Sequence, residues 1–250
     1  VDSLSDLTTF TGNTATGNGV SDFEGTFVNV IGSTLSIDDT GGDCSTIGDW
    51  NSATKTCTLT FDFTSDSVGI VIASDGITLD GNGHTISGAG SSASQEDWGV
   101  DARSKDNFTI KNLNIENFGV GVMTSHTPSG GTITGNTISL NRLGIYAETD
   151  TGLKITNNIV TLNESNGITI NQATGSWQCT GINDFLVKEN NVSSNTGNGI
   201  EYMAGVEVGG VCFEDNTVNS NENGFALYNS QKAKFTNNIS NSNSNYGFTF

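Results

Sequence analysis

Apolar and polar residues alternate in short, strand-like runs that return along the second half of the chain. Each run has an apolar residue, usually an asparagine three positions later, and usually a second apolar residue two positions beyond that asparagine. Successive runs are separated by 23, 22, 32, 26 and 22 residues. A short step that tolerates insertions is typical of a solenoid, in which each repeat forms one turn. The first apolar residues of the runs are Ile110, Ile133, Ile155, Val187, Phe213 and Phe235.

Asparagines recur at two fixed places in five of these runs, whereas Leu113 stands at the first place in the earliest run. Stacked turns bring like residues above like, so each set is expected to form a ladder. Asparagine side chains suit such turns because they bond backbone groups and tolerate left-handed conformations. The first set comprises Asn136, Asn158, Asn190, Asn216 and Asn238, and the second comprises Asn141, Asn163, Asn195, Asn221 and Asn243.

The repeat length and the composition together favour a parallel β-helix. Leucine-rich repeats would require a leucine ladder, and helical repeats would require long 3.6-residue periodicity with few glycines, yet the chain has 32 Gly. Short alternating strands separated by Gly and Asn suit turns stacked about 4.8 Å apart. A β-sandwich with Asn-rich turns is the alternative, but it would not need asparagine at the same offset five times. We therefore predict an all-β solenoid of about eight to nine coils.

The repeats divide the chain into two parts of unequal length. Residues 35–250 are predicted to form the β-helix, with inserts near 89–107, 171–184 and 205–211. Residues 1–34 lack the repeat and are predicted to be an N-terminal cap or an exchangeable β segment. Phe248 and Phe250 would face an open end of the last turn, so this segment could pair there in a neighbouring subunit. Head-to-tail self-association is therefore one expectation, and a local cap with further sequence beyond Phe250 is the other.

The charge of the chain narrows the choice of partners. The net charge is −18, with 9 Lys+Arg against 27 Asp+Glu, and such a surface repels nucleic acid and anionic lipid. No apolar run approaches the roughly 20 residues of a membrane-spanning helix. We therefore expect neither a nucleic-acid partner nor a membrane-spanning segment.

The four cysteines cluster in two pairs. Their positions favour disulfides between Cys44 and Cys57 and between Cys179 and Cys212, with a metal site as the rival interpretation. Disulfides require an oxidising compartment, and a chain that starts at Val1 fits a processed secreted protein or part of one. The expected location is extracellular or at the cell surface.

The stretch from Asp75 to Gly88, with the sequence DGITLDGNGHTISG, resembles the opening coil of right-handed parallel β-helix proteins. These form the carbohydrate-binding and sugar-hydrolase (CASH-type) group, whose generic repeats are similar to residues 110–250. The resemblance covers about 210 residues and implies a right-handed helix in a secreted or surface-displayed protein. Asp80, Asn82 and His84 are candidates for a catalytic trio within it. The alternative is that Asp80-Gly and Asn82-Gly form turns while His84 packs on the next coil.

Candidate binding residues lie mainly in the inserts. Aromatic platforms with nearby hydrogen-bonding groups are typical of glycan sites, and Asp38, Asp39 and Asp43 form a carboxylate cluster that suggests calcium or a solvated turn. Four N-glycosylation sequons occur, and Asn107 and Asn191 are the better acceptors because Asn163 and Asn238 hold ladder positions. The candidate glycan-binding residues are Trp50, Trp98, Trp177, Asp97 and Asp101.

A paired-carboxylate catalytic site is not evident in the repeats, because the positions that stack carry Asn rather than Asp. We therefore predict a non-catalytic extracellular or cell-surface protein with a structural or adhesive role, such as a filament or coat subunit that contacts glycans. The alternative is a polysaccharide-active enzyme, namely a lyase, hydrolase or epimerase.

Overall fold

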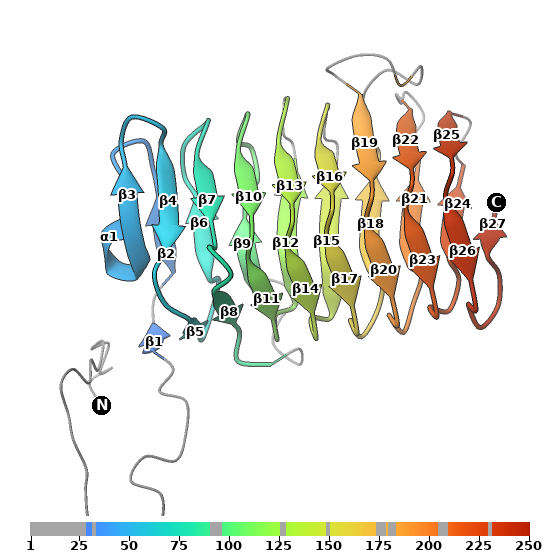
Figure 1. The fold of residues 1–250 in the computed structure, drawn as a ribbon, viewed down its shortest axis with the longest axis horizontal. Helices are drawn as coiled ribbons and strands as arrows, with labels where there is room; N and C mark the ends of the chain where they lie inside the picture. The colour runs from blue at the N-terminus through green and yellow to red at the C-terminus, as the bar shows by residue number, and fades with distance from the viewer. Residues whose placement is uncertain are drawn as a thin grey trace, which may run out of the picture.

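The computed structural model describes residues 29–31, 34–90, 97–125, 129–148, 151–173, 179, 184–204, 210–229 and 232–250. Over these residues the chain forms an all-β solenoid whose strands stack along one axis (Figure 1). Three sheets of nine strands each run the length of the solenoid, and their strand pairs are parallel except for one hairpin. This confirms the predicted parallel β-helix.

The sheets are named A, B and C. Sheet A comprises β1 (Asn29–Ile31), β5 (Phe63–Ser65), β8 (Thr85–Ser87), β11 (Asn114–Glu116), β14 (Thr137–Ser139), β17 (Ile159–Thr161), β20 (Asn191–Ser193), β23 (Thr217–Asn219) and β26 (Ile239–Asn241). Sheet B comprises β2 (Leu35–Ile37), β6 (Ile70–Ile72), β9 (Trp98–Asp101), β12 (Val120–Ser125), β15 (Leu143–Glu148), β18 (Ile168–Asn171), β21 (Ile200–Met203), β24 (Phe225–Tyr228) and β27 (Phe248–Thr249). Sheet C comprises β3 (Gly48–Asn51), β4 (Thr56–Leu59), β7 (Thr78–Asp80), β10 (Thr109–Lys111), β13 (Thr132–Thr134), β16 (Lys154–Thr156), β19 (Phe185–Lys188), β22 (Val211–Glu214) and β25 (Ala233–Thr236).

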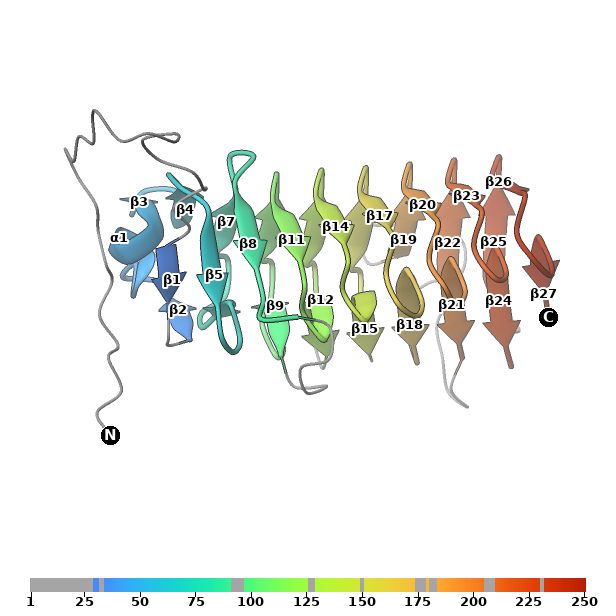
Figure 2. The ribbon, with the colours of Figure 1, turned by 90° about the horizontal axis from the view of Figure 1, so that it is seen from below.

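Each regular turn passes through sheets B, C and A in that order, and seven such turns run from β6–β8 to β24–β26 (Figure 2). The first coil differs because it contains the short helix α1 (Cys44–Ile47) and the antiparallel hairpin of β3 and β4. The sequence predicts eight to nine coils, whereas the structure has these seven regular turns, preceded by the irregular coil and followed by the single strand β27. β1, which lies in the segment predicted as a cap, pairs with β5 at the edge of sheet A.

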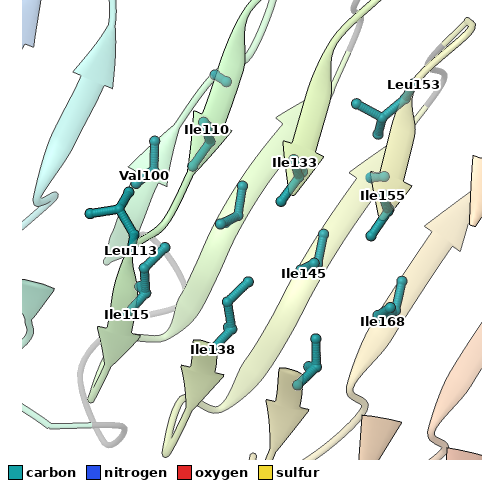
Figure 3. Packing of buried hydrophobic residues seen from close by; sticks show 14 of the residues in the cluster. Val100, Ile110, Leu113, Ile115, Ile133, Ile138, Ile145, Leu153, Ile155 and Ile168 are labelled. Carbon is teal, nitrogen blue, oxygen red and sulfur yellow. The ribbon is translucent and has the colours of Figure 1, made fainter. Parts of the chain in front are cut away.

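The core consists of apolar columns because the register places the inward residue of each strand over its counterpart. In sheet C, Ile110, Ile133 and Ile155 are register partners and fully buried (Figure 3). In sheet A, Ile115 and Ile138 form an equivalent pair. Burying one such side chain contributes about 1.5–3 kcal/mol, so the repeated apolar residue stabilises every turn in the same way.

One predicted insert is shorter than expected. The range 89–107 contains β9, in which Val100 is fully buried and pairs with Ile70 and Val122 on either side. The expectation of a continuous polar insert was therefore wrong. The alternation of side chains along residues 98–101 satisfies the sheet B register even though the flanking residues are polar.

Both predicted disulfides form. Cys44 bonds to Cys57, which fastens α1 to β4, and Cys179 bonds to Cys212 on β22. The described residues contain no free cysteine. These bonds indicate an oxidising, extracytoplasmic environment. In the part of the chain that the structure describes, no helix is long and apolar enough to cross a membrane.

The asparagines of the first set form a continuous ladder along one corner of the solenoid. Asn158 shows the pattern: its Oδ1 accepts hydrogen bonds from the backbone N–H and from Nδ2 of Asn136, both at 3.0 Å. Its own Nδ2 donates to Oδ1 of Asn190 at 3.0 Å and to the carbonyl of Ile133 at 2.9 Å. The second set repeats this pattern at the next corner, where Asn163 is linked to Asn141 and Asn195.

Asn190 is 2% exposed and lies in the middle of the first ladder. Asn190→Leu removes the acceptor for Asn158 and the donor to Ile155 and Asn216. We expect this change to reduce the free energy of unfolding by about 1–3 kcal/mol, because buried polar groups lose their partners. Denaturant titration measures this effect. The exposed Asn241→Leu, at a position where only the backbone is hydrogen-bonded among the described residues, is the control, and an equal loss in both variants would contradict the role of the ladder.

Candidate functional site

The turn between β7 and β8 projects beyond the turns of the following coils. Asp80 is in register with Lys111 and Thr134, and Thr85 is in register with Asn114 and Thr137, so this turn has two extra residues. Left-handed backbone at Asn82 (φ 51°) and Gly83 (φ 85°) allows the chain to reverse there. Next to the turn lies a shallow hollow of about 390 Å³, lined by Asn82, Gly83, Asn112, Leu113, Asn114 and Gly135.

Side-chain bonds fix this turn to the next coil. Nδ2 of Asn114 donates to the carbonyl of Gly83 at 2.7 Å, and Nδ2 of Asn112 donates to Oδ1 of Asp80 at 3.0 Å. Nζ of Lys111 lies 3.0 Å from Oδ2 of Asp80. Partial burial of Asp80 opposes its ionisation, but the hydrogen bonds from Asn112 and Lys111 outweigh burial and lower the pKa of this carboxyl.

A second carboxylate orients His84 beside the same turn. Oδ1 of Asp62 lies 2.9 Å from Nδ1 of His84 and also accepts the backbone N–H of Thr85 at 2.9 Å. The Thr85 bond is the main reason that the pKa of Asp62 is lowered, and His84 adds to it. Within the described residues, Nε2 of His84 has no hydrogen-bond partner. The predicted trio of Asp80, Asn82 and His84 therefore lies in one turn. The carboxylate of Asp80 is bonded to Asn112 and Lys111, whereas the imidazole of His84 is bonded to Asp62.

Lysines line the outer face of sheet C. Of the nine Lys and Arg residues in the chain, four flank the first apolar residue of a run and so point outward from this sheet. Half-buried threonines occupy neighbouring outward places, and Oγ1 of Thr156 donates to Oγ1 of Thr134 at 3.0 Å. The sequence carries this signal, because a cation next to a repeated apolar residue must face solvent, but the candidate residues predicted above lie mainly in the inserts and do not include these lysines. The four are Lys111, Lys154, Lys188 and Lys234.

These lysines differ in their surroundings. Lys188 lies near three carboxylates, those of Glu189, Glu214 and Asp215, at 3.5–3.8 Å. Glu189 is the main cause of its raised pKa, although burial opposes the effect. Lys154 makes no ion pair within the described part of the chain. A row of outward-facing polar side chains thus runs along β10, β13 and β16, in which Lys111 is paired with Asp80 and Lys154 has no ion pair among the described residues.

The tryptophan rings predicted to bind glycans, as far as the structure describes them, are covered by other residues. The guanidinium of Arg103 stacks over the ring of Trp98 at 3.7 Å and bonds both carboxylate oxygens of Asp101 at 3.0 Å. The ring of Trp50 packs against the hydrophobic core and Gly41, so a Cβ at Gly41 would lie 2.9 Å from it. Asp97 is half-buried, and Trp177 lies outside the described residues. The structure therefore does not assemble these residues into one glycan site.

The predicted calcium ligands do not converge either. Oδ1 of Asp38 accepts bonds from the backbone and hydroxyl of Thr40, which lower its pKa. Asp43 accepts the N–H of Ser36 at 2.9 Å, and Asp39 is exposed. Among the described residues, no group of three His, Cys, Asp or Glu side chains is arranged to hold a metal ion. The three carboxylates therefore do not converge on one point, because Asp38 bonds its own turn, Asp43 bonds Ser36 and Asp39 is exposed; calcium binding stays a prediction.

The ionisation states of Asp62 and Asp80, which lie beside the turn between β7 and β8, determine which reactions this site can catalyse. Glycoside hydrolysis requires one carboxyl whose pKa is raised enough for it to act as an acid. Asp62 and Asp80 both have lowered pKa values, so they remain ionised and serve as hydrogen-bond acceptors. The arrangement suits polar recognition, with the Lys111 ammonium group and the imidazole of His84 lying beside these carboxylates.

A model of the family described as the right-handed beta helix region matches residues 48–209. No curated protein matches the sequence. Among solved structures, the chain is similar to the A-module of mannuronan C-5 epimerase AlgE6 from Azotobacter vinelandii, with a TM-score of 0.52 and 14% identity. The match covers 88% of this chain and 64% of that module. At this identity the similarity shows a shared fold.

The lowered pKa of Asp80 predicts how stability depends on pH. Its folded-state pKa lies below the ordinary value of 3.8, so its contribution is fully present above that value and is lost as the pH falls through the folded-state pKa. Asp80→Asn should therefore destabilise the protein by on the order of 1 kcal/mol at neutral pH, since the pair is partly open to solvent. The difference from the parent should shrink in acid. Unfolding measured across pH checks this, with the exposed Asp66→Asn as control, and a difference that is independent of pH would refute it.

Proposed function

Because the chain belongs to the right-handed β-helix family, we propose that the outer face of sheet C binds an extended acidic polysaccharide. The observation that carries this proposal is the concentration of four of the nine cations beside the repeat anchors of one sheet in a chain of net charge −18. The role is that of an extracellular adhesive protein, which agrees with the oxidising environment indicated by the disulfides.

The outward-facing side chains from β7 to β16 supply the contacts that such a polymer needs. Strands about 4.8 Å apart place Lys111 and Lys154 about 10 Å from each other along the axis, since one strand lies between them. Thr134 and Thr156 present hydroxyls beside them, and the hollow next to Asn82 provides amide donors and acceptors. Ammonium groups attract the carboxylates or sulfates of the polymer, while hydroxyls and amides bond its sugar hydroxyls.

The similarity to a mannuronan epimerase module supports a polysaccharide as the ligand, since that protein's name gives it a polymeric substrate. Head-to-tail self-association stays a prediction beside this function. The partner strand proposed for it lies largely within residues 1–28, outside the described residues.

A second function, acid–base modification of the bound polymer by a lyase or epimerase reaction, is favoured by the Asp62–His84 pair. A carboxylate that bonds one imidazole nitrogen leaves the other available to take a proton. The lowered pKa values of Asp62 and Asp80 suit the role of carboxylates that orient a base rather than that of a general acid for hydrolysis.

The binding proposal predicts that Lys154→Gln weakens the affinity for polygalacturonate roughly fivefold, as expected when about 1 kcal/mol of ion pairing is lost. Calorimetry at low salt measures the change, and added salt should reduce binding. Lys105→Gln, a cation outside the strands of sheet C, should bind like the parent. Equal binding of fully methyl-esterified polygalacturonate, which lacks the charge, would overturn the acidic ligand.

Turnover separates the two candidates. Incubation of the bound polymer in D₂O, followed by NMR for incorporated deuterium and by ultraviolet absorbance for unsaturated ends, detects epimerase or lyase chemistry. Binding without turnover is the expected result. Turnover that disappears in His84→Ala, while Lys154→Gln affects mainly the affinity, would instead establish the enzyme.

A further inference from the structure

The outer face of sheet A carries an apolar patch, consisting of Leu140, Ile159 and Leu162. Their exposed fractions are 44%, 46% and 54%. Leu140 and Leu162 hold the same place in successive turns, because each follows directly on residues paired between β14 and β17. Leu140 and Leu162 therefore lie one above the other, and Ile159 lies three residues before Leu162, at the start of β17; these exposed side chains offer apolar surface that a covering group would shield from solvent.

The backbone conformation of these turns does not require leucine at positions 140 and 162. Leu140 (φ 57°) and Leu162 (φ 58°) adopt the left-handed conformation, which bulky side chains disfavour. The equivalent turn position in four other coils holds a small polar residue at a similar angle: Asn117, Ser194, Ser220 and Ser242. An exposed apolar residue in a strained turn gains stability only if something packs on it.

Asn191 lies immediately beside this patch. It is exposed at the start of β20, and its register partner on β17 is Ile159, so the two side chains stand next to each other on the same face. The sequence Asn191-Val-Ser193 is a sequon for N-glycosylation. Ser193 is two residues further along the strand and faces the same way. Within the described residues, the carboxamide of Asn191 has no hydrogen-bond partner.

The other sequons are not equivalent. Asn163 is 1% exposed, and its amide bonds Asn195 and the carbonyl of Ile138. Asn238 donates to the carbonyls of Phe213 and Thr236. Asn107 is exposed, but its Oδ1 lies against Gly130, where a Cβ would be 2.4 Å away. Asn191 alone among the four combines a free amide with an apolar neighbour that a sugar could cover.

We propose that Asn191 carries an N-linked glycan whose first sugars lie over Ile159 and toward Leu162. In the modification, Nδ2 loses a proton and forms a bond to C1 of the sugar, while the bond from C1 to the phosphate of a lipid-linked donor breaks. The lipid phosphate leaves with the electron pair. The amide keeps one N–H, and the apolar face of the sugar ring packs on the isoleucine. The disulfides place the chain in a compartment compatible with this transfer.

Peptide mass spectrometry of the protein purified from its native source, before and after enzymatic deglycosylation, tests the proposal. We expect a glycopeptide at Asn191 and unmodified Asn163 and Asn238. Ser193→Ala, which keeps Asn191 but removes the sequon, should abolish the modification. An unmodified Asn191 in the native protein would overturn the proposal.

A separate measurement tests whether the glycan on Asn191 covers the apolar side chains beside it. Removal of the glycan, or Ser193→Ala, should increase retention on a hydrophobic-interaction column. Ile159→Thr, which copies Thr137 and Thr217 at the same register position, should cancel that increase. Retention that does not change when the glycan is lost would show that the sugar does not lie on the patch. Asn107→Gln serves as the control for loss of a second sequon.

Discussion

A buried carboxamide needs a hydrogen-bond partner for both its oxygen and its nitrogen, and in this protein the partner is a carboxamide one turn away. Asn136, Asn158 and Asn190 satisfy one another and the adjacent backbone in this way. A turn that slipped by one residue would leave these groups unpaired, at a cost of several buried hydrogen bonds. The ladders therefore fix the register, and the register determines which residues form the core and which face outward. The row of lysines on sheet C and the patch on sheet A both follow from that constraint.

The ladders could be predicted from the sequence because they depend on a property that repeats. A recurrent offset between an apolar residue and an asparagine identifies the turn, its corner and the residue above it without any knowledge of side-chain geometry. The disulfide pairs could also be predicted from the sequence, because the cysteines fall in two groups and Cys44 and Cys57 are close in the chain. β9 was missed because its neighbours are polar and it is a single strand, so that no repeat revealed it.

The candidate site was harder to predict because it depends on particular side chains that occur once. Aromatic residues in the inserts suggested platforms, yet Arg103 covers Trp98 and the core covers one side of Trp50. Packing of this kind is decided in three dimensions and has no signature in spacing. The lysines of sheet C were recognisable, by contrast, because Lys111, Lys154 and Lys188 each adjoin a repeat anchor. Two extra residues in one turn then distinguish the coil beside Asp80 from its neighbours.

The direction of the hydrogen bonds in the ladders has an electrical consequence. Every ladder amide before the last of each set receives bonds at its oxygen from the preceding turn and donates from its nitrogen to the asparagine of the following turn, as Asn158 does between Asn136 and Asn190. Its second N–H donates back to a carbonyl of the preceding turn. The amide dipoles are therefore aligned along the axis, and hydrogen bonds arranged in series polarise one another. The solenoid thus has a permanent polarity, with the amide nitrogens of both corners directed toward the C-terminal coils. Its two ends present opposite fields to any ion or chain that approaches along the axis.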